Sequence, residues 1–285
     1  MPKEVIRSRA NATVKRARAA REGRERGLVF VEGVRLCEEA ARSGLKIEEV
    51  LYTERLSDDE RGARLLEALG GAARRVSAVA EDVFSSLSDT KTPQGVVALA
   101  ERPRTDAGAL DRDAATDATD ERDARRPLLV VLHGVGNPSN AGAMLRVAEA
   151  AGATGVIATA GSADLFSPKA LRGAMGSSFR VPVWAGATFA EALRWCAERG
   201  VRTVSTDVRA TRSHAEIDWT VASAVVMGSE GGGLLEDERD ATDLRLRIPM
   251  RPPVESLNVA VALAVVLYEA ARQRGAVESS IVNRE

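Results

Sequence analysis

The segment PLLVVLHGVGNPSNAGAMLRVAEAAG spans residues 127–152 and joins an apolar run to a helical pattern through a short polar turn. Its first six residues form a continuous apolar run of the kind that lies inside a parallel sheet. Asn140 can cap a helix over 141–151, and Gly152 closes that helix. A strand followed by a helix is the repeating unit of α/β domains, so this segment predicts one.

The same alternation continues to the C-terminus. It predicts further strands and helices, with strands over 155–158, 201–204, 222–227 and 244–248 and helices over 168–173, 189–199 and 257–272. We therefore expect residues 128–285 to form a mostly parallel, doubly wound α/β domain. The apolar face of Val261, Ala264, Val265 and Tyr268 is expected to pack on the sheet or on a partner subunit.

A second, smaller α/β domain is expected toward the N-terminus. Strands over 28–31, 47–52, around Val76 and over 95–100 alternate with predicted helices over 33–43, 59–70 and 80–88. Residues 103–127 contain mainly Asp, Ala, Arg and Thr and too few bulky apolar residues to offset the entropy of ordering, which predicts a flexible linker. The expected domains are therefore 1–102 and 128–285, joined by 103–127.

The charge of the whole chain is nearly balanced, with a net charge of −1, so any nucleic-acid surface must be local. Residues 1–27 form such a region, because nine Lys or Arg face three Glu there. Lys15, Arg16 and Arg18 are candidate contacts to a phosphate backbone, although a solvated helix in an Arg-rich protein would look the same. The absence of aromatic residues indicates affinity without base readout.

Metal and membrane sites are not expected. The two cysteines and the two histidines lie far apart, which gives no metal-ligand spacing and favours a reduced, cytoplasmic setting. The longest apolar run, residues 259–268, is too short to span a bilayer.

Three polar or glycine-rich segments each follow a predicted strand, where open α/β sheets bind ligands: 137–146, 227–233 and 248–259. Taken singly, each has an ordinary structural interpretation: a capped strand–helix junction, a flexible turn, and a loop in which Ser256 caps the next helix. The glycine cluster lacks the Gly-Lys-Ser/Thr ending of a Walker phosphate-binding loop. It is not a nucleophile elbow either, because Glu230 occupies the position that the nucleophilic Ser would need.

Together the three segments resemble the SpoU/TrmH branch of the SPOUT methyltransferases. The matching pieces are Asn140-x-Gly-x-x-x-Arg146, Gly228-Ser-Glu-Gly-x-Gly233, and Ile248-Pro-Met250 followed by Ser256-Leu-Asn-Val259. Residues 1–102 resemble the substrate-binding domain that often precedes this catalytic domain, through FVEGVR at 30–35 and TPQGVV at 92–97.

The resemblance implies a parallel sheet with a C-terminal trefoil knot that holds S-adenosyl-L-methionine (SAM), and a homodimer with the active site near the subunit interface. It places the cofactor against Gly228, Ile248, Leu257, Ser205, Thr206, Met250 and Ser256. It assigns Arg146 to a ribose 2′-hydroxyl, with Asn140, Glu230 and Asn258 orienting that arginine. It adds Arg35 and Arg172 to the expected RNA contacts, although Arg172 also fits a solvated helix position.

The activity that the resemblance implies is SAM-dependent methylation of a ribose 2′-hydroxyl in structured RNA, with 23S rRNA as the expected target. A tRNA 2′-O-methyltransferase and a base methyltransferase are the enzymatic alternatives. The alternative from another class is a non-catalytic RNA-binding or ribosome-assembly factor with a vestigial SAM pocket. Because a guanidinium stays protonated in proteins, Arg146 is expected to act as a positioned cation.

Overall fold

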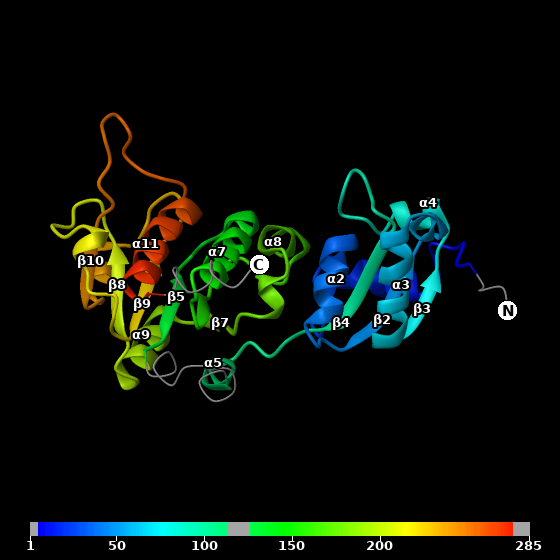
Figure 1. Cartoon of the computed structure of the whole chain (residues 1–285), viewed down its shortest axis with the longest axis horizontal. Helices are drawn as coiled ribbons and strands as arrows, with labels where there is room; N and C mark the ends of the chain where they lie inside the picture. Colours follow the sequence, from blue (N-terminus) through cyan, green and yellow to red (C-terminus); the bar gives the residue numbers. More distant parts are fainter. Residues whose placement is uncertain (1–4, 113–125, 276–285) are drawn as a thin grey trace. The chain divides into compact units, whose positions relative to one another are not determined.

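The computed structural model describes residues 5–112 and 126–275. The chain divides into two compact units, and each is described by itself (Figure 1). The first unit contains the chain up to Pro103 together with Leu165–Arg180, and the second contains Arg104–Asp164 and the chain from Val181 onward. The segment 165–180, expected in the C-terminal domain, therefore groups with the first unit.

The first unit is built on a four-stranded sheet in the order β1-β4-β2-β3, with strands β1 (Leu28–Glu32), β2 (Ile47–Tyr52), β3 (Ala73–Ala78) and β4 (Val96–Glu101). Only the β2–β3 pair is parallel. The helices are α1 (Ala12–Arg21), α2 (Val34–Arg42), α3 (Glu60–Ala72) and α4 (Glu81–Ser85), with a 3-10 turn η1 (Glu54–Asp58) and, from the later segment, α8 (Pro168–Ala174) and η2 (Ser177–Phe179).

The second unit is built on a six-stranded sheet in which every neighbouring pair is parallel. Its order is β10-β8-β9-β5-β6-β7, with strands β5 (Leu128–Leu132), β6 (Gly155–Thr159), β7 (Val183–Ala187), β8 (Arg202–Thr206), β9 (Ser223–Met227) and β10 (Leu244–Leu246). The predicted parallel α/β sheet is confirmed. Strand β7 was not predicted, because it lies at the sheet edge and carries exposed small residues, Ala185 and Gly186, instead of a buried apolar run.

Helices cover both faces of this sheet, as a doubly wound fold requires. They are α5 (Ala107–Arg112), α7 (Pro138–Ala150), α9 (Phe189–Glu198), α10 (Glu236–Asp240) and α11 (Val259–Gln273), with a 3-10 turn η3 (His214–Glu216). Leu110 of α5 and Ala192 and Cys196 of α9 share a core with one face of the strands. On the other face, α7 and α11 pack side by side (Figure 1).

The expectation of a single flexible linker over 103–127 is wrong for its first part. Residues Ala107–Arg112 form helix α5, and Leu110 is only 8% exposed. Its side chain packs in the core of the second unit with Leu129 and Cys196. One well-placed leucine is enough to dock a short helix, and the composition of a whole segment does not reveal it. Residues 113–125 of the expected linker lie outside the described part of the chain.

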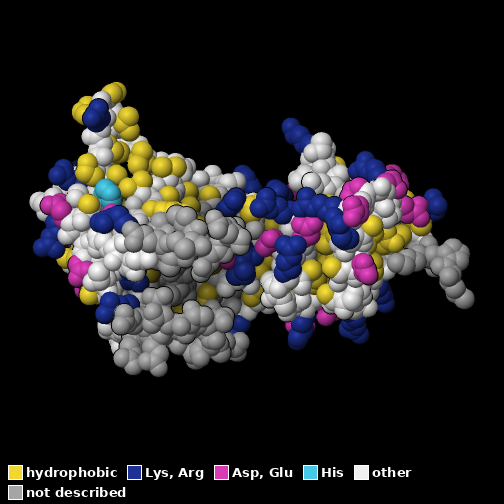
Figure 2. Space-filling view, viewed as in Figure 1, with side chains coloured by type: hydrophobic (Ala, Val, Ile, Leu, Met, Phe, Trp, Pro, Cys, Tyr) yellow, Lys and Arg dark blue, Asp and Glu magenta, His cyan; other side chains and the backbone are white. Residues whose placement is uncertain are grey.

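Helix α11 does not pack on the sheet through the face of Val261 and Tyr268, and the alternative that this face packs on a partner subunit stays a prediction. Its buried residues are Ala260, Leu263, Val266, Leu267, Ala270 and Ala271. Val261 and Tyr268 are instead 50% and 49% exposed, and hydrophobic side chains gather on this side of the second unit (Figure 2). The helix is apolar almost all round, so periodicity alone could not select the face that packs on the sheet.

Candidate functional site

The candidate site lies at the carboxyl ends of four neighbouring strands, β10, β8, β9 and β5. The loop after β5 leads into α7, whose N-cap is Asn137: its Oδ1 accepts from Ser139 N at 2.9 Å. The expectation that Asn140 caps this helix is therefore wrong, because Pro138 already starts it with a φ suited to the first helical position. Asn140 lies inside the first turn and its side chain is left for other contacts.

The glycine loop after β9, residues 228–233, closes on itself. Ser229 N donates to Gly233 O at 3.2 Å, and Gly233 N donates to Ser229 O at 3.0 Å. A Cβ at Gly228 would lie 2.3 Å from Gly233 C, and Gly233 has a φ of +63°. Glycine is therefore required at both positions by the turn itself.

Glu230, at the tip of this loop, accepts three hydrogen bonds from the β5–α7 segment. Its carboxylate accepts from Gly136 N at 3.2 Å, from Asn137 N at 3.1 Å and from the Asn140 amide at 3.1 Å. Burial alone would raise the pKa of Glu230, but hydrogen bonds from the Asn140 amide and from backbone N–H groups outweigh it and lower the pKa. Glu230 is thus a charged group that organises the loop, and a poor proton acceptor.

Asn258 connects this cluster to the last helix. Its Nδ2 donates to Asn140 Oδ1 at 3.2 Å, while its Oδ1 accepts from Ala260 N at 2.9 Å and caps α11. The expectation that Ser256 caps this helix is wrong, since α11 begins at Val259 and not at Leu257. Glu230, Asn140 and Asn258 therefore form one hydrogen-bonded chain that joins the three segments singled out in the sequence.

Arg146 does not join that chain. It lies in the third turn of α7, because the helix begins at Pro138 and not near Ala141, and its side chain is exposed. Six residues separate it from Asn140, which corresponds to about 9 Å along the axis. Among residues 5–112 and 126–275, none forms a hydrogen bond or an ion pair with its side chain. Its guanidinium is available to a ligand or a partner.

The expected cofactor residues lie at three adjacent strand ends. Ser205 and Thr206 end β8, Gly228 follows β9, and Ile248, Met250, Ser256 and Leu257 belong to the segment after β10. Ser205 is fully buried and its Oγ lies 2.8 Å from Thr242 Oγ1 in the α10–β10 connection, so its hydroxyl is not exposed to a ligand.

The glycine loop and the segment 248–258 suit an elongated ligand held by backbone groups. A Cβ added at Gly231 would meet no atom within 4 Å, so the backbone there is open to an approaching ligand. Val254 and Leu257, in the segment before α11, are 53% and 37% exposed and supply apolar surface. These residues fit a cofactor such as SAM, which combines an adenine ring with apolar faces and a charged, polar amino-acid end.

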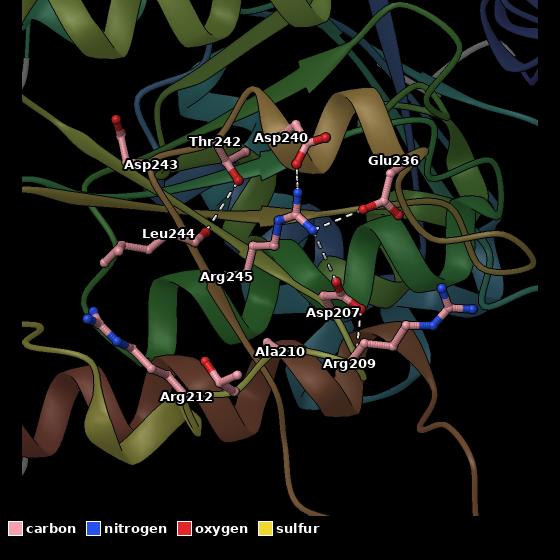
Figure 3. Close-up of a pocket in the computed structure, with 11 residues that line it drawn as sticks. Asp207, Arg209, Ala210, Arg212, Glu236, Asp240, Thr242, Asp243, Leu244 and Arg245 are labelled. Atoms are coloured by element: carbon pink, nitrogen blue, oxygen red, sulfur yellow. Dashed lines mark hydrogen bonds and ion pairs between the residues drawn. The ribbon is translucent and has the colours of Figure 1, made fainter.

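A separate hollow of about 520 Å³ was not anticipated from the sequence. It is lined by residues of the loop after β8, of α10 and of β10, and Arg245 lies at its centre (Figure 3). The Arg245 guanidinium lies 3.7 Å from Asp207 and 3.1 Å from Glu236, and it also pairs with Asp240. Its central arginine is paired with three carboxylates, and none of the residues expected to hold the cofactor lies in it, so we do not assign the cofactor to it.

The expected RNA contacts divide into exposed and engaged side chains. Lys15, Arg16 and Arg35 are exposed. Arg18 donates to Ser86 Oγ at 3.2 Å, and Arg172 lies 2.8 Å from Asp89. Helix α1 is also not a loose arm, because its Val14, Ala17 and Ala20 are buried in the core of the first unit.

The two sequence cues of the first unit meet in space. Gln94 Oε1 accepts from Val34 N at 2.9 Å, and a Cβ at Gly33 would lie 2.9 Å from the same oxygen. The segments FVEGVR and TPQGVV thus form one structural feature, in which the glutamine satisfies the first N–H of α2.

No cluster of three or more His, Cys, Asp or Glu that could hold a metal is present within the described ranges. Likewise, no described helix is both long enough and apolar enough to cross a bilayer.

Family models match both parts of the chain. The SpoU rRNA Methylase family model matches residues 127–268, and the MRM3-like substrate binding domain matches residues 11–98.

Named relatives cover most of the chain. A 23S rRNA (guanosine-2′-O-)-methyltransferase, RlmB, of Bordetella pertussis is 39% identical over 79% of this chain and 89% of that enzyme. A 23S rRNA (guanosine(2553)-2′-O)-methyltransferase, RlmP, of Bacillus subtilis is 31% identical over 89% of this chain and 92% of that enzyme.

Solved structures have the same fold. The SpoU methyltransferase AviRb of Streptomyces viridochromogenes, in complex with AdoMet, superposes with a TM-score of 0.80 at 27% identity, covering 96% of this chain and 100% of that one. An AdoMet-bound rRNA methyltransferase of Sinorhizobium meliloti gives a TM-score of 0.79 at 27% identity, with 94% and 97% of the chains covered.

Proposed function

Because the chain belongs to the SpoU rRNA methylase family, we propose that it transfers a methyl group from SAM to the 2′-hydroxyl of a guanosine in 23S rRNA. Enzymatic 2′-O-methylation of RNA with SAM as cofactor follows from the family. The individual site residues and the target nucleotide are the parts that we propose here.

The observation that supports the site is the hydrogen-bonded chain Glu230–Asn140–Asn258. It brings together the β5–α7 turn, the glycine loop and the start of α11 at the carboxyl ends of the strands, where open α/β sheets bind ligands. A vestigial pocket would not need three segments held together by exposed polar side chains at one place, which argues against a non-catalytic factor.

Bound SAM supplies an electrophilic methyl group on a sulfonium. We assign its contacts to the backbone around Gly228 and to Thr206, Ile248, Met250, Ser256 and Leu257, with Ser205 contributing through its main chain. Backbone donors in a preformed loop hold a ligand without the entropy cost of ordering long side chains.

Arg146 is the group we assign to the ribose. Its guanidinium is exposed, carries five N–H donors and stays protonated, so it can hold the 2′-oxygen and stabilise negative charge that develops there. The hydrogen bonds among Asn140, Glu230 and Asn258 hold the glycine loop and the start of α11 against α7, the helix that carries Arg146. Because none of them contacts Arg146 within the described structure, we propose that they shape the site and do not orient the guanidinium directly.

The RNA is bound by the first unit as well as by the site. Lys15, Arg16 and Arg35 are exposed cations that we propose as phosphate contacts, whereas Arg18 and Arg172 would first have to leave Ser86 and Asp89. The expected separation into 1–102 and 128–285 remains our assignment of substrate-binding and catalytic domains.

We also propose a homodimer, because α11 leaves Val261 and Tyr268 half exposed beside Val254 and Leu257 in the preceding segment. Exposed apolar side chains that gather on one side of a unit, as in Figure 2, mark protein contacts. A partner on this face could meet the exposed guanidinium of Arg146, since α7 packs against α11. A C-terminal trefoil knot and a cytoplasmic location belong to the same proposal, the latter because the named relatives act on ribosomal RNA.

The proposal is tested with the purified chain, SAM labelled on the methyl group, and separate 23S rRNA and tRNA substrates. Nuclease digestion of the labelled RNA should release a 2′-O-methylguanosine from 23S rRNA. Label in tRNA would support the tRNA alternative, and label on a base would support a base methyltransferase. RNA binding without any transfer would contradict an enzymatic role.

A further inference from the structure

His133 is the first residue after β5, and no part of the proposed site yet uses it. Its ring is held on three sides. Nδ1 lies 2.9 Å from Thr159 Oγ1 at the end of β6, and Nε2 lies 2.8 Å from Glu238 Oε1 in α10. The ring packs on Phe189 with the centroids 4.4 Å apart. A side chain with this many directed contacts has a defined position.

The hydrogen-bond chemistry defines the donors. A carboxylate only accepts, so the neutral ring carries its proton on Nε2 and donates it to Glu238, while Nδ1 accepts from the Thr159 hydroxyl. Burial alone would raise the pKa of Glu238, but the Leu235 N–H and the His133 ring outweigh it and lower the pKa. The contact is thus a charge-assisted hydrogen bond.

The contact joins two parts of the candidate site. The second oxygen of Glu238 accepts from Leu235 N at 2.8 Å, at the point where the glycine loop ends. Within the glycine loop, the Glu230 carboxylate accepts hydrogen bonds from the backbone N–H groups of Gly136 and Asn137. The glycine loop is therefore attached twice to the segment 133–140, once by Glu230 near its start and once through Glu238 just beyond its end.

We propose that His133 is a positioning residue that, through Glu238, holds the glycine loop in the conformation that receives SAM. The proposal rests on the proposed function, because it requires the loop to bind the cofactor. The physical reason is preorganisation: a loop that is already ordered loses less entropy when the ligand binds. His133 itself need not touch the cofactor.

The variants follow from the geometry. His133→Ala removes the donor, and His133→Gln places an amide N–H where it can reach Glu238. Glu238→Ala removes the same contact from the other side. Glu236→Gln is the matched control, because Glu236 lies in the same helix but pairs with Arg239 and Arg245 instead of His133.

Two measurements on the full chain, without RNA, test the proposal: the SAM dissociation constant by calorimetry and amide hydrogen exchange of residues 228–240. We expect His133→Ala to weaken SAM binding about tenfold, as losing one charge-assisted hydrogen bond can do, and to speed exchange in this segment selectively. His133→Gln should restore most of both, and Glu236→Gln should leave the dissociation constant unchanged. The double variant His133→Ala/Glu238→Ala should bind SAM as tightly as whichever single variant binds it less tightly, because both substitutions remove the same contact.

SAM binding by His133→Ala within about twofold of the unmodified chain, whatever its melting temperature, would overturn the proposal. Equal weakening by Glu236→Gln would do the same, since it would indicate general destabilisation of α10. If His133→Ala does not fold, Glu238→Ala takes its place under the same criteria, and His133→Gln is still expected to bind SAM nearly as tightly as the unmodified chain. Absence of SAM binding by the unmodified chain would instead refute the proposed function, and this inference with it.

Discussion

The Nδ2 of Asn258 donates to the Oδ1 of Asn140 at 3.2 Å and joins the start of α11 to the first turn of α7 across 118 residues of sequence. The same asparagine caps α11 with its other side-chain atom. One residue therefore serves both the stability of the last helix and the geometry of the site, and substitutions can separate the two roles.

Asn258→Asp should keep the cap and lose the link, because the carboxylate retains an acceptor but has no N–H to donate to Asn140. Asn258→Ala should lose both. We expect Asn258→Ala to lower the free energy of unfolding by about 1–2 kcal/mol, as loss of a helix cap does, and Asn258→Asp to lower it much less. Urea unfolding and methyl-transfer rates measured on both variants check this. Equal activity of Asn258→Asp and the unmodified chain would show that the link is dispensable.

Arg146→Ala should retain SAM binding and lose roughly 10²–10⁴-fold in methyl-transfer rate, the range for a group that stabilises charge in the transition state. Arg194, an exposed arginine of α9, provides the matched control, and Arg194→Ala should keep the rate. Single-turnover kinetics with saturating RNA isolate the transfer step. Near-normal turnover of Arg146→Ala would refute the assignment.

Gly228→Ala should disturb the glycine loop, and Gly231→Ala should not. A Cβ at Gly228 meets backbone at 2.3 Å, whereas a Cβ at Gly231 meets nothing within 4 Å. We expect Gly228→Ala to cost roughly 1–3 kcal/mol in unfolding free energy, the usual cost of overpacking, and to weaken SAM binding. Gly231→Ala should retain stability within about 0.5 kcal/mol. A loss of SAM affinity in Gly231→Ala at unchanged stability would indicate that the cofactor lies against that residue.

Glu230 gives a pH-dependent prediction. Its pKa in the folded chain is lower than its ordinary value of 4.5, so its charged form stabilises the fold. That contribution is fully present above the ordinary pKa and is lost as the pH falls through the lowered one. The difference in unfolding free energy between the unmodified chain and Glu230→Gln should therefore be constant near neutral pH and shrink below about pH 4.5. A difference that does not change in acid would contradict the lowered pKa.

If the exposed face of α11 is the dimer contact, charged substitutions on it should weaken the dimer. Val261→Glu and Tyr268→Glu should shift the chain from dimer to monomer, because a carboxylate cannot be buried unpaired in an apolar contact. Val208 is 65% exposed in the loop after β8 and not in α11, so Val208→Glu serves as the control. Sedimentation velocity across a concentration series measures the shift. A monomeric unmodified chain at all concentrations would disprove the dimer.

The sequence by itself determined the fold class and the segments that build the site. A short apolar run such as Leu128–Leu132 is typical of a buried strand, and its alternation with predicted helices favours a parallel sheet. Glycines 228 and 233, Asn140 and Asn258 were singled out because their three segments together resemble the SpoU/TrmH pattern, although each segment alone has an ordinary structural interpretation. Local patterns carry this information, since they depend on neighbours within a few residues.

The tertiary structure decided what depends on contacts between distant residues. Asn137 and Asn258, and not Asn140 and Ser256, cap their helices, because cap choice depends on where the chain first turns helical. Glu230 reaches Asn140 across 90 residues of sequence, and His133 reaches Glu238 across 105. Because α11 is apolar almost all round, the sequence allowed more than one face to be buried. Packing against α7 and the sheet decided that Val261 and Tyr268 are exposed. These outcomes follow from the free energy of the whole packed unit, which no short window of sequence contains.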